Sequence, residues 1–121
     1  MVGLAQTTEP GVDAVQSGVN VEVSYKEPTT SLGGLPLDDL AYTTIYVVEG
    51  EVVIETIEVP AVSVNGGNSI NQQVIVDVPR GQIKNLTIIA TATDLSGNES
   101  DPIDTAIRLD RDPPGQVNKQ Q

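Results

Sequence analysis

The feature that most constrains this chain is a period of two in its apolar residues. Apolar side chains at every second position occur in four segments: VNVEVSY (19–25), INQQVIVDVP (70–79), NLTIIATATD (85–94) and IDTAIRLD (103–110). Successive side chains of a strand point to opposite faces of a sheet, so this period is typical of strands with one buried face. Helical periodicity is nearly absent, and the many Val, Ile and Thr residues favour strands. The chain is therefore predicted to be all-β.

Turn residues divide the pattern into six or seven short strands. Glu49 and Gly50 separate two apolar runs within residues 41–60, as a hairpin turn does, and residues 64–69 (VNGGNS) form a second break. In the first segment, Val19, Val21, Val23 and Tyr25 are predicted to share one buried face. Short strands with turn chemistry between them indicate an antiparallel β-sandwich.

The ends of the chain are predicted to lie outside the sandwich. Alternation and apolar content are lost after residue 110, where Pro113, Pro114 and Gly115 mark the exit. We expect an N-terminal arm at residues 1–9, one sandwich domain at residues 10–110 and a C-terminal tail at residues 111–121.

Residue types that are missing restrict the chemistry. The chain has no Cys, His, Trp or Phe, so its core must be aliphatic and it lacks the commonest general base and transition-metal ligand. Its carboxylates fall mostly at turn or solvent-facing positions, and no nucleophile with a base can be assembled from the spacing. We expect no enzyme activity and no cofactor.

Charge narrows the range of partners. Seventeen acidic and six basic residues give a formal net charge of −11, which disfavours nucleic acid and anionic membranes as partners. No Lys or Arg lies between Lys26 and Arg80, whereas eight carboxylates do: Glu27, Asp38, Asp39, Glu49, Glu51, Glu55, Glu58 and Asp77. One edge or face should be strongly negative, which serves either simple solubility or a basic partner surface.

Targeting signals are not apparent. The first residues have neither a basic start nor a continuous apolar stretch, and no segment approaches the roughly 18 apolar residues of a membrane span. If Met1 is the natural start, the protein is not expected to be exported by the general route. If it is not, the chain could be a module of a larger secreted protein.

The segment DLSGNESD, residues 94–101, can be interpreted in two ways. Oxygen ligands at alternate positions suit Ca²⁺, and Asp94, Asn98 and Asp101 are the candidate ligands, although the spacing is not that of an EF-hand. The structural interpretation explains every residue: Gly97 and Asn98 tolerate left-handed backbone, while Asp94 and Ser100 can bond the turn. We favour a structural corner.

A second loop is too apolar for a free surface segment. Residues 31–40 (SLGGLPLDDL) carry four leucines, which are Leu32, Leu35, Leu37 and Leu40. They either fold back as a lid over one end of the sandwich or form a docking patch for another subunit, and both interpretations stay open.

Four segments resemble the fibronectin type III fold of bacterial and phage proteins, over about residues 10–110. VNVEVSYKEP is similar to the second strand of that family, with Tyr25 and Pro28 matching its aromatic and proline positions. DDLAYTTIYVVEG looks like the third strand, VIVDVPRGQIKNLTIIATATDLSGNES ends in a similar A-x-D-x-x-G-N-E-S corner, and DPIDTAIRLDRDPPG resembles the closing strand. The resemblance implies a seven-stranded fibronectin type III or immunoglobulin-like sandwich. The family usually has Trp at Tyr25 and a hydrogen-bonding Tyr near Leu86, so the usual aromatic anchors are missing here.

Two functions fit this resemblance. The first is a non-catalytic bacteriophage virion protein, acting in capsid decoration, neck or tail. It would contact other virion proteins, or copies of itself, through sheet edges, the leucine loop and terminal arms that include Pro113, Pro114 and Val117. The second is an extracellular module of a secreted bacterial enzyme or adhesin, serving as a spacer or binding carbohydrate or a cell surface. Carbohydrate platforms usually need exposed aromatics, and the chain has only Tyr25, Tyr42 and Tyr46, of which at least one should be buried.

Overall fold

Seven strands make up the regular structure of this protein. The computed structural model describes residues 10–120, and no helix occurs in that range. The strands are β1 (Val12–Ser17), β2 (Asn20–Lys26), β3 (Leu40–Glu49), β4 (Val52–Pro60), β5 (Ser69–Ile75), β6 (Ile83–Asp94) and β7 (Ile103–Asp110). The predicted all-β class is confirmed, while the predicted N-terminal arm lies outside the described residues.

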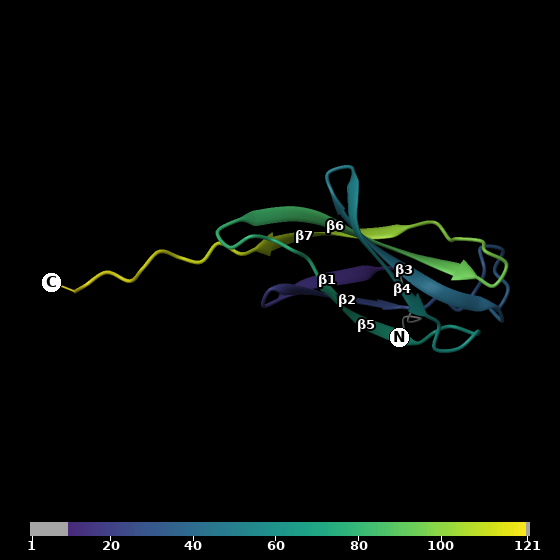
Figure 1. The fold of residues 1–121 in the computed structure, drawn as a ribbon. Helices are drawn as coiled ribbons and strands as arrows, with labels where there is room; N and C mark the ends of the chain where they lie inside the picture. The colour runs from purple at the N-terminus through teal and green to yellow at the C-terminus, as the bar shows by residue number, and fades with distance from the viewer. Residues whose placement is uncertain (1–9, 121) are drawn as a thin grey trace, which may run out of the picture.

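The strands form two antiparallel sheets that lie face to face. One sheet has the order β1-β2-β5 and the other the order β4-β3-β6-β7 (Figure 1). Every ladder within the two sheets is antiparallel. The prediction of a two-layered antiparallel fold is therefore correct at this level.

The core lies between the sheets and is almost entirely aliphatic. Its fully buried side chains come from the inward positions of both sheets and from the segment after β5, and the largest are Ile45, Ile88, Leu109, Val21, Val23, Val47, Val74 and Val78. Tyr25 is the buried aromatic residue of this core and is 8% exposed. Burying one aliphatic side chain contributes about 1.5–3 kcal/mol, so this alternating set drives the two sheets together.

A glutamine side chain joins the two sheets. Gln16 follows Val12 and Ala14 on the inward face of β1, and its amide contacts the backbone of Asp110 at the end of β7. The Gln16 Nε2 atom donates to the Asp110 carbonyl at 2.7 Å, and the Asp110 N–H donates to Gln16 Oε1 at 3.0 Å. The side chain thus satisfies both backbone groups of one residue, as a neighbouring strand would.

Two tight hairpins begin with a glycine of positive φ. Gly50 has φ of 63° and lies between Glu49 and Val52, which pair with each other. The predicted hairpin is confirmed, but its two turn residues are Gly50 and Glu51, and Glu49 is the last residue of β3. Gly18 has φ of 61° and plays the same part between Ser17 and Asn20. Positive φ at the first central residue is typical of type II′ turns.

The first hairpin corrects one sequence prediction. Val19 lies in the turn and is 50% exposed, so it does not share the buried face of Val21, Val23 and Tyr25. β2 thus begins at Asn20, one residue later than the predicted segment.

The segment after β5 stays in the core after its ladder ends. β5 ends at Ile75, yet Val76 and Val78 are 5% and 2% exposed. Alternating burial therefore extends beyond the hydrogen-bonded strand. Arg111, just after β7, bonds this same segment at Val78, Gly81 and Gln82, and the residues after it extend away from the sheets (Figure 1).

The glutamine contact generates a stability prediction. Gln16→Ala should lower the free energy of unfolding by about 1–3 kcal/mol, because it leaves the N–H and C=O of Asp110 without these partners. Urea unfolding followed by circular dichroism measures this. Gln73→Ala, on the exposed side of β5, is the control and should change stability by less than about 0.5 kcal/mol. Equal effects of the two variants would refute the inter-sheet role of Gln16.

Candidate functional site

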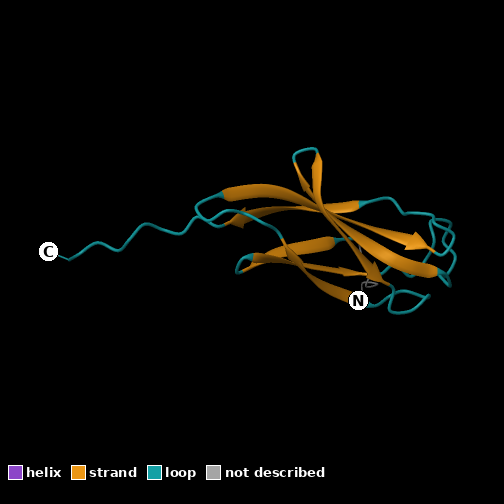
Figure 2. Ribbon diagram, in the orientation of Figure 1, coloured by secondary structure: helices purple, strands orange, loops and turns teal. Residues whose placement is uncertain are grey.

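Three loops meet at one end of the sandwich. They connect β2 to β3 (27–39), β4 to β5 (61–68) and β6 to β7 (95–102), and they lie together at the right of Figure 2. Backbone hydrogen bonds join them: Leu95 N–H donates to the Asp39 carbonyl at 2.8 Å, and Leu40 N–H donates to the Val64 carbonyl at 3.0 Å. We call this set of three loops the loop end.

A buried carboxylate holds the 61–68 loop. Glu27 is 3% exposed. Its Oε2 accepts the N–H of Val62 at 3.0 Å, while its Oε1 accepts the backbone N–H of Asn68 at 3.2 Å and the Asn68 side-chain amide at 3.0 Å. Counting Glu27 among the carboxylates of a negative face was therefore wrong, since this residue organises a loop from within.

Five large apolar side chains are exposed at the loop end. They are Leu32 (99% exposed), Leu35 (69%), Val62 (66%), Val64 (45%) and Leu95 (69%), so each of the three loops contributes at least one. Scattered exposed aliphatics are ordinary, whereas several on adjoining loops indicate an interaction surface. The loop end carries such a group of exposed aliphatic side chains.

The four leucines of the 31–40 segment separate into two groups. Leu32 and Leu35 lie in a tight turn, where Ser31 N–H bonds the Leu35 carbonyl at 2.8 Å and Gly34 N–H bonds the Ser31 carbonyl at 2.9 Å. Leu37 is half-buried, and Leu40 is 3% exposed as the first residue of β3. Leu40 is thus a core residue and cannot dock a partner, while Leu32 and Leu35 remain accessible.

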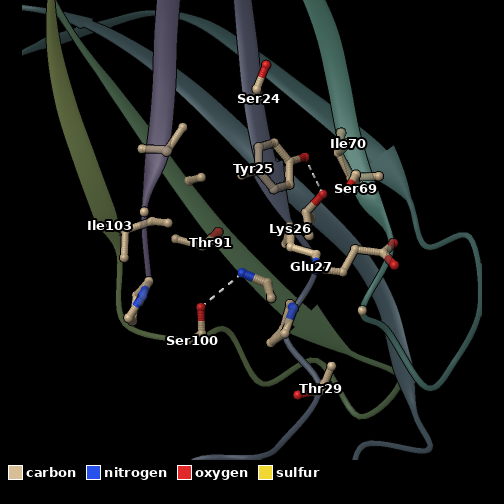
Figure 3. Close-up of a pocket in the computed structure, with 18 of the residues that line it drawn as sticks. Ser24, Tyr25, Lys26, Glu27, Thr29, Ser69, Ile70, Thr91, Ser100 and Ile103 are labelled. Atoms are coloured by element: carbon tan, nitrogen blue, oxygen red, sulfur yellow. Dashed lines mark hydrogen bonds between the residues drawn. The ribbon is translucent and has the colours of Figure 1, made fainter. Parts of the chain in front are cut away.

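A groove of about 830 Å³ opens between the two sheets beside the loop end (Figure 3). Tyr25 points into the space between the sheets, and its hydroxyl hydrogen-bonds Thr43 Oγ1 at 2.5 Å. Burial raises the pKa of Tyr25. Among the described residues, no buried side-chain nitrogen or oxygen lacks a partner, so the groove contains no orphaned polar atom that would indicate a ligand.

We call residues 94–101, which include the sequence GNES at 97–100, the GNES corner. Its polar side chains hydrogen-bond within the corner and to the adjoining strand. Asp94 Oδ1 accepts the N–H groups of Ser96 and Asn98, each at 2.9 Å, and Oδ2 accepts the Asn98 side-chain amide at 3.1 Å. Ser100 Oγ accepts the N–H of Ala92 at 2.9 Å. The predicted bonds of Asp94 to the turn backbone are confirmed, whereas Ser100 bonds the backbone of Ala92 in β6. Gly97 has φ of 90°, but Asn98 has no positive φ, so left-handed backbone is needed at only one of the two positions.

Two of the Ca²⁺ ligand candidates from the sequence are engaged with each other. Asp94 and Asn98 are bonded to each other, whereas Asp101 contributes only its backbone carbonyl, which accepts from Ser100 Oγ at 3.0 Å. Within residues 10–120, no group of three or more Asp or Glu residues has the arrangement to hold a metal ion. The geometry is that of the corner interpretation.

Glu99 attaches the corner to the outer face of the four-stranded sheet. Its Oε2 accepts the hydroxyl of Thr91 at 2.6 Å and that of Tyr46 at 2.7 Å. These two hydroxyls lower the pKa of Glu99, and the bond to Glu99 raises the pKa of Tyr46. The corner is therefore a fixed support for Leu95 at the loop end.

The predicted docking residues of the tail lie at the opposite end of the molecule. Pro113, Pro114 and Val117 are exposed, Val117 to 97%, on a segment that leads away from both sheets (Figure 1). The structure therefore does not bring them together with Leu32 and Leu35.

Sequence reasoning missed several residues of the loop end. Val62, Val64 and Leu95 are single apolar residues in polar turns, which carry no pattern, and Glu27 looks like surface charge because its partners are 35 and 41 residues away. Only tertiary structure places these residues together.

Comparison with protein-family models, with curated proteins and with solved structures finds no match for the chain. In the part of the chain that the structure describes, no helix has the length and apolar character needed to cross a membrane. The function must therefore be inferred from the site itself.

The corner should respond to acid. The backbone N–H of Asn98, followed by its side-chain amide, lowers the pKa of Asp94. A lowered pKa stabilises the folded corner fully above the ordinary carboxyl pKa of about 4, and this contribution is lost as the pH falls through the lowered value. In an NMR titration, the amide signals of Ser96 and Asn98 should shift over the pH range in which Asp94 takes up a proton.

Asp94→Asn should abolish that acid transition at both amides, whereas Asp104→Asn, on β7, should leave it in place. If the amides of Ser96 and Asn98 still titrate in Asp94→Asn, another group controls the corner.

Proposed function

We propose that this protein is a non-catalytic structural domain that docks to other protein subunits through its loop end. The observation that carries the proposal is the group of five exposed apolar side chains on three loops that are joined by hydrogen bonds. A surface held rigid before binding loses little conformational entropy on association, which favours docking.

The finer fold assignment supports the proposal. In an immunoglobulin constant-type sandwich, the fourth strand belongs to the sheet that contains the first two strands. Here β4 belongs to the other sheet, where it pairs with β3. Together with the GNES corner and the proline-bearing exit, this order favours the fibronectin type III-like fold that the sequence resembles. Loops at one end of such sandwiches form binding surfaces in antibody variable domains.

The setting that we propose is a bacteriophage virion, as a capsid-decoration, neck or tail protein. Phage particles commonly carry small sandwiches of this type, and the acidic charge favours partner proteins over nucleic acid. This step rests on the family resemblance, because fold alone does not determine function.

One observation favours the alternative of an extracellular module. Tyr42 and Tyr46 alternate with the buried Thr43, Ile45 and Val47 along β3, so both tyrosines lie on the outer face of the four-stranded sheet. Two tyrosines on a flat face can stack on sugar rings. The Tyr46 hydroxyl is bonded to Glu99, which fixes the tip of this side chain.

The proposed function predicts that the protein is found in particles. It should co-purify with phage particles from the organism that encodes it, as detected by mass spectrometry of gradient-purified virions. Leu35→Lys should weaken its affinity for these particles about thirtyfold and so lower its occupancy in them, because burying one leucine contributes about 2 kcal/mol.

The matched control is Val15→Lys, which alters a 63% exposed valine on β1 away from the loop end and should leave occupancy unchanged. Recovery of the protein only as part of a larger secreted polypeptide would contradict the virion role and support the extracellular module.

A further inference from the structure

The edge strand β4 leaves one side of its backbone unpaired. β4 is the first strand of the order β4-β3-β6-β7, so its only partner in the described part of the chain is β3. An open edge presents N–H and C=O groups that can pair with another strand, and proteins usually protect such edges.

The register identifies which groups of β4 are open. Ala61 N–H donates to the Ala41 carbonyl at 3.0 Å, and the partners Tyr42 with Pro60 and Thr43 with Val59 continue the same register. Backbone groups of an antiparallel strand alternate in direction. Those of Val59 and Ile57 therefore face β3, while those of Thr56 and Glu58 face away from it.

Protection of this edge consists of a proline at the end nearest the loop end, a register shift opposite Val47 and Val48, and the charges of Glu55 and Glu58. Pro60 lacks an N–H and ends β4 there, which prevents pairing at that point. Towards the hairpin turn, the strand carries the exposed apolar residues Val52 (62%), Val53 (53%) and Ile54 (37%). The turn itself, near residue 50, stands away from the two layers (Figure 1). The part of the edge without a proline is residues 52–58, and its register with β3 is regular over residues 55–58.

The charge of the hairpin selects the partner. Glu49, Glu51, Glu55 and Glu58 lie on the two strands and their turn, which have no Lys or Arg. Lys84 Nζ lies 3.4 Å from Glu49 Oε1, so it compensates one of these charges. Pairing of two β4 edges would bring like charges together, which is unfavourable across strands, whereas opposite charges are favourable.

We propose that the free edge of β4, residues 52–58, accepts an extended segment of a different protein in which Lys or Arg alternates with aliphatic residues. The segment adds a fifth strand to the sheet, with its backbone bonded to Thr56 and Glu58, its cations beside Glu58 on the outer face, and its aliphatic residues beside Ile57, which packs against the core. The inference deepens the proposed docking function by naming a second surface and the chemistry of its partner.

A synthetic peptide tests the proposal on the full-length protein. The probe is a blocked eight-residue peptide of alternating lysine and valine, titrated into labelled protein and followed by NMR. The amide signals of Val53 to Glu58 should shift, and the N–H groups of Thr56 and Glu58 should become protected from exchange. A peptide with glutamate in place of lysine should bind at least tenfold more weakly.

Matched proline variants separate edge pairing from charge alone. Thr56→Pro removes an outward N–H without removing a bond to β3, and it should weaken binding of the lysine-valine peptide roughly tenfold. The control is Gln73→Pro on β5, the edge strand of the other sheet. Glu27 N–H bonds the Asn68 carbonyl at 2.9 Å, and the register of β5 places the Gln73 backbone away from β2. Gln73→Pro should not change binding.

Glu58→Lys gives an independent readout if Thr56→Pro does not fold. It should weaken binding of the lysine-valine peptide at low salt, and the difference from the unaltered protein should shrink as salt rises. Shifts on β5 or β7 in place of β4, or equal effects of Thr56→Pro and Gln73→Pro, would overturn the inference.

This test is separate from that of the proposed function. If Leu35→Lys reduces particle occupancy but the peptide does not bind β4, the loop-end function stands and the edge inference fails. If the peptide binds β4 but the protein is not found in particles, the edge inference stands and the virion role fails.

Discussion

The structure depends on burying one alternating aliphatic face from each sheet against the other. Each strand contributes only two or three side chains to the core, with the partly buried ones that pack against it included, and Tyr25 is the aromatic among them. A core of this kind gains its stability from many similar contacts and not from one large anchor. Position along a strand therefore matters more than the identity of any one residue, which fits the dominance of Val and Ile.

The same constraint determines where the molecule can interact. Because the inward face of each sheet is buried in the core, only loops, outer faces and strand edges can contact partners. At the loop end, Glu27, Asp39 and the GNES corner hold three loops in place and leave their aliphatic side chains in solvent. At the opposite end, the β3–β4 hairpin extends past β6 after the pair Val48 and Thr87, so its tip has no layer to cover it. Two separate contact surfaces suit a domain that connects neighbours in an assembly.

Much of the fold was predictable because its signal is local. Strands with a strict period of two, such as β2, β6 and β7, and the turn at Gly50 follow from the sequence. β1 was not identified as a strand, because its third inward position is Gln16, which breaks the apolar alternation and becomes meaningful only beside Asp110. The site was less predictable. Leu32 and Leu35 were recognised by composition, but the burial of Leu40 and Glu27 and the contributions of Val62 and Leu95 depend on contacts between distant segments.

The central claim is that β4 offers an open, acidic edge in the isolated protein. Residue-by-residue amide hydrogen exchange of the free protein, measured by NMR, tests it most directly. We expect the exchange rates to alternate: the amides of Ile57 and Val59, which face β3, exchange slowly, while those of Thr56 and Glu58 exchange at close to the unprotected rate. Uniform slow exchange over these four residues would contradict the account, because it would mean that the edge is already covered.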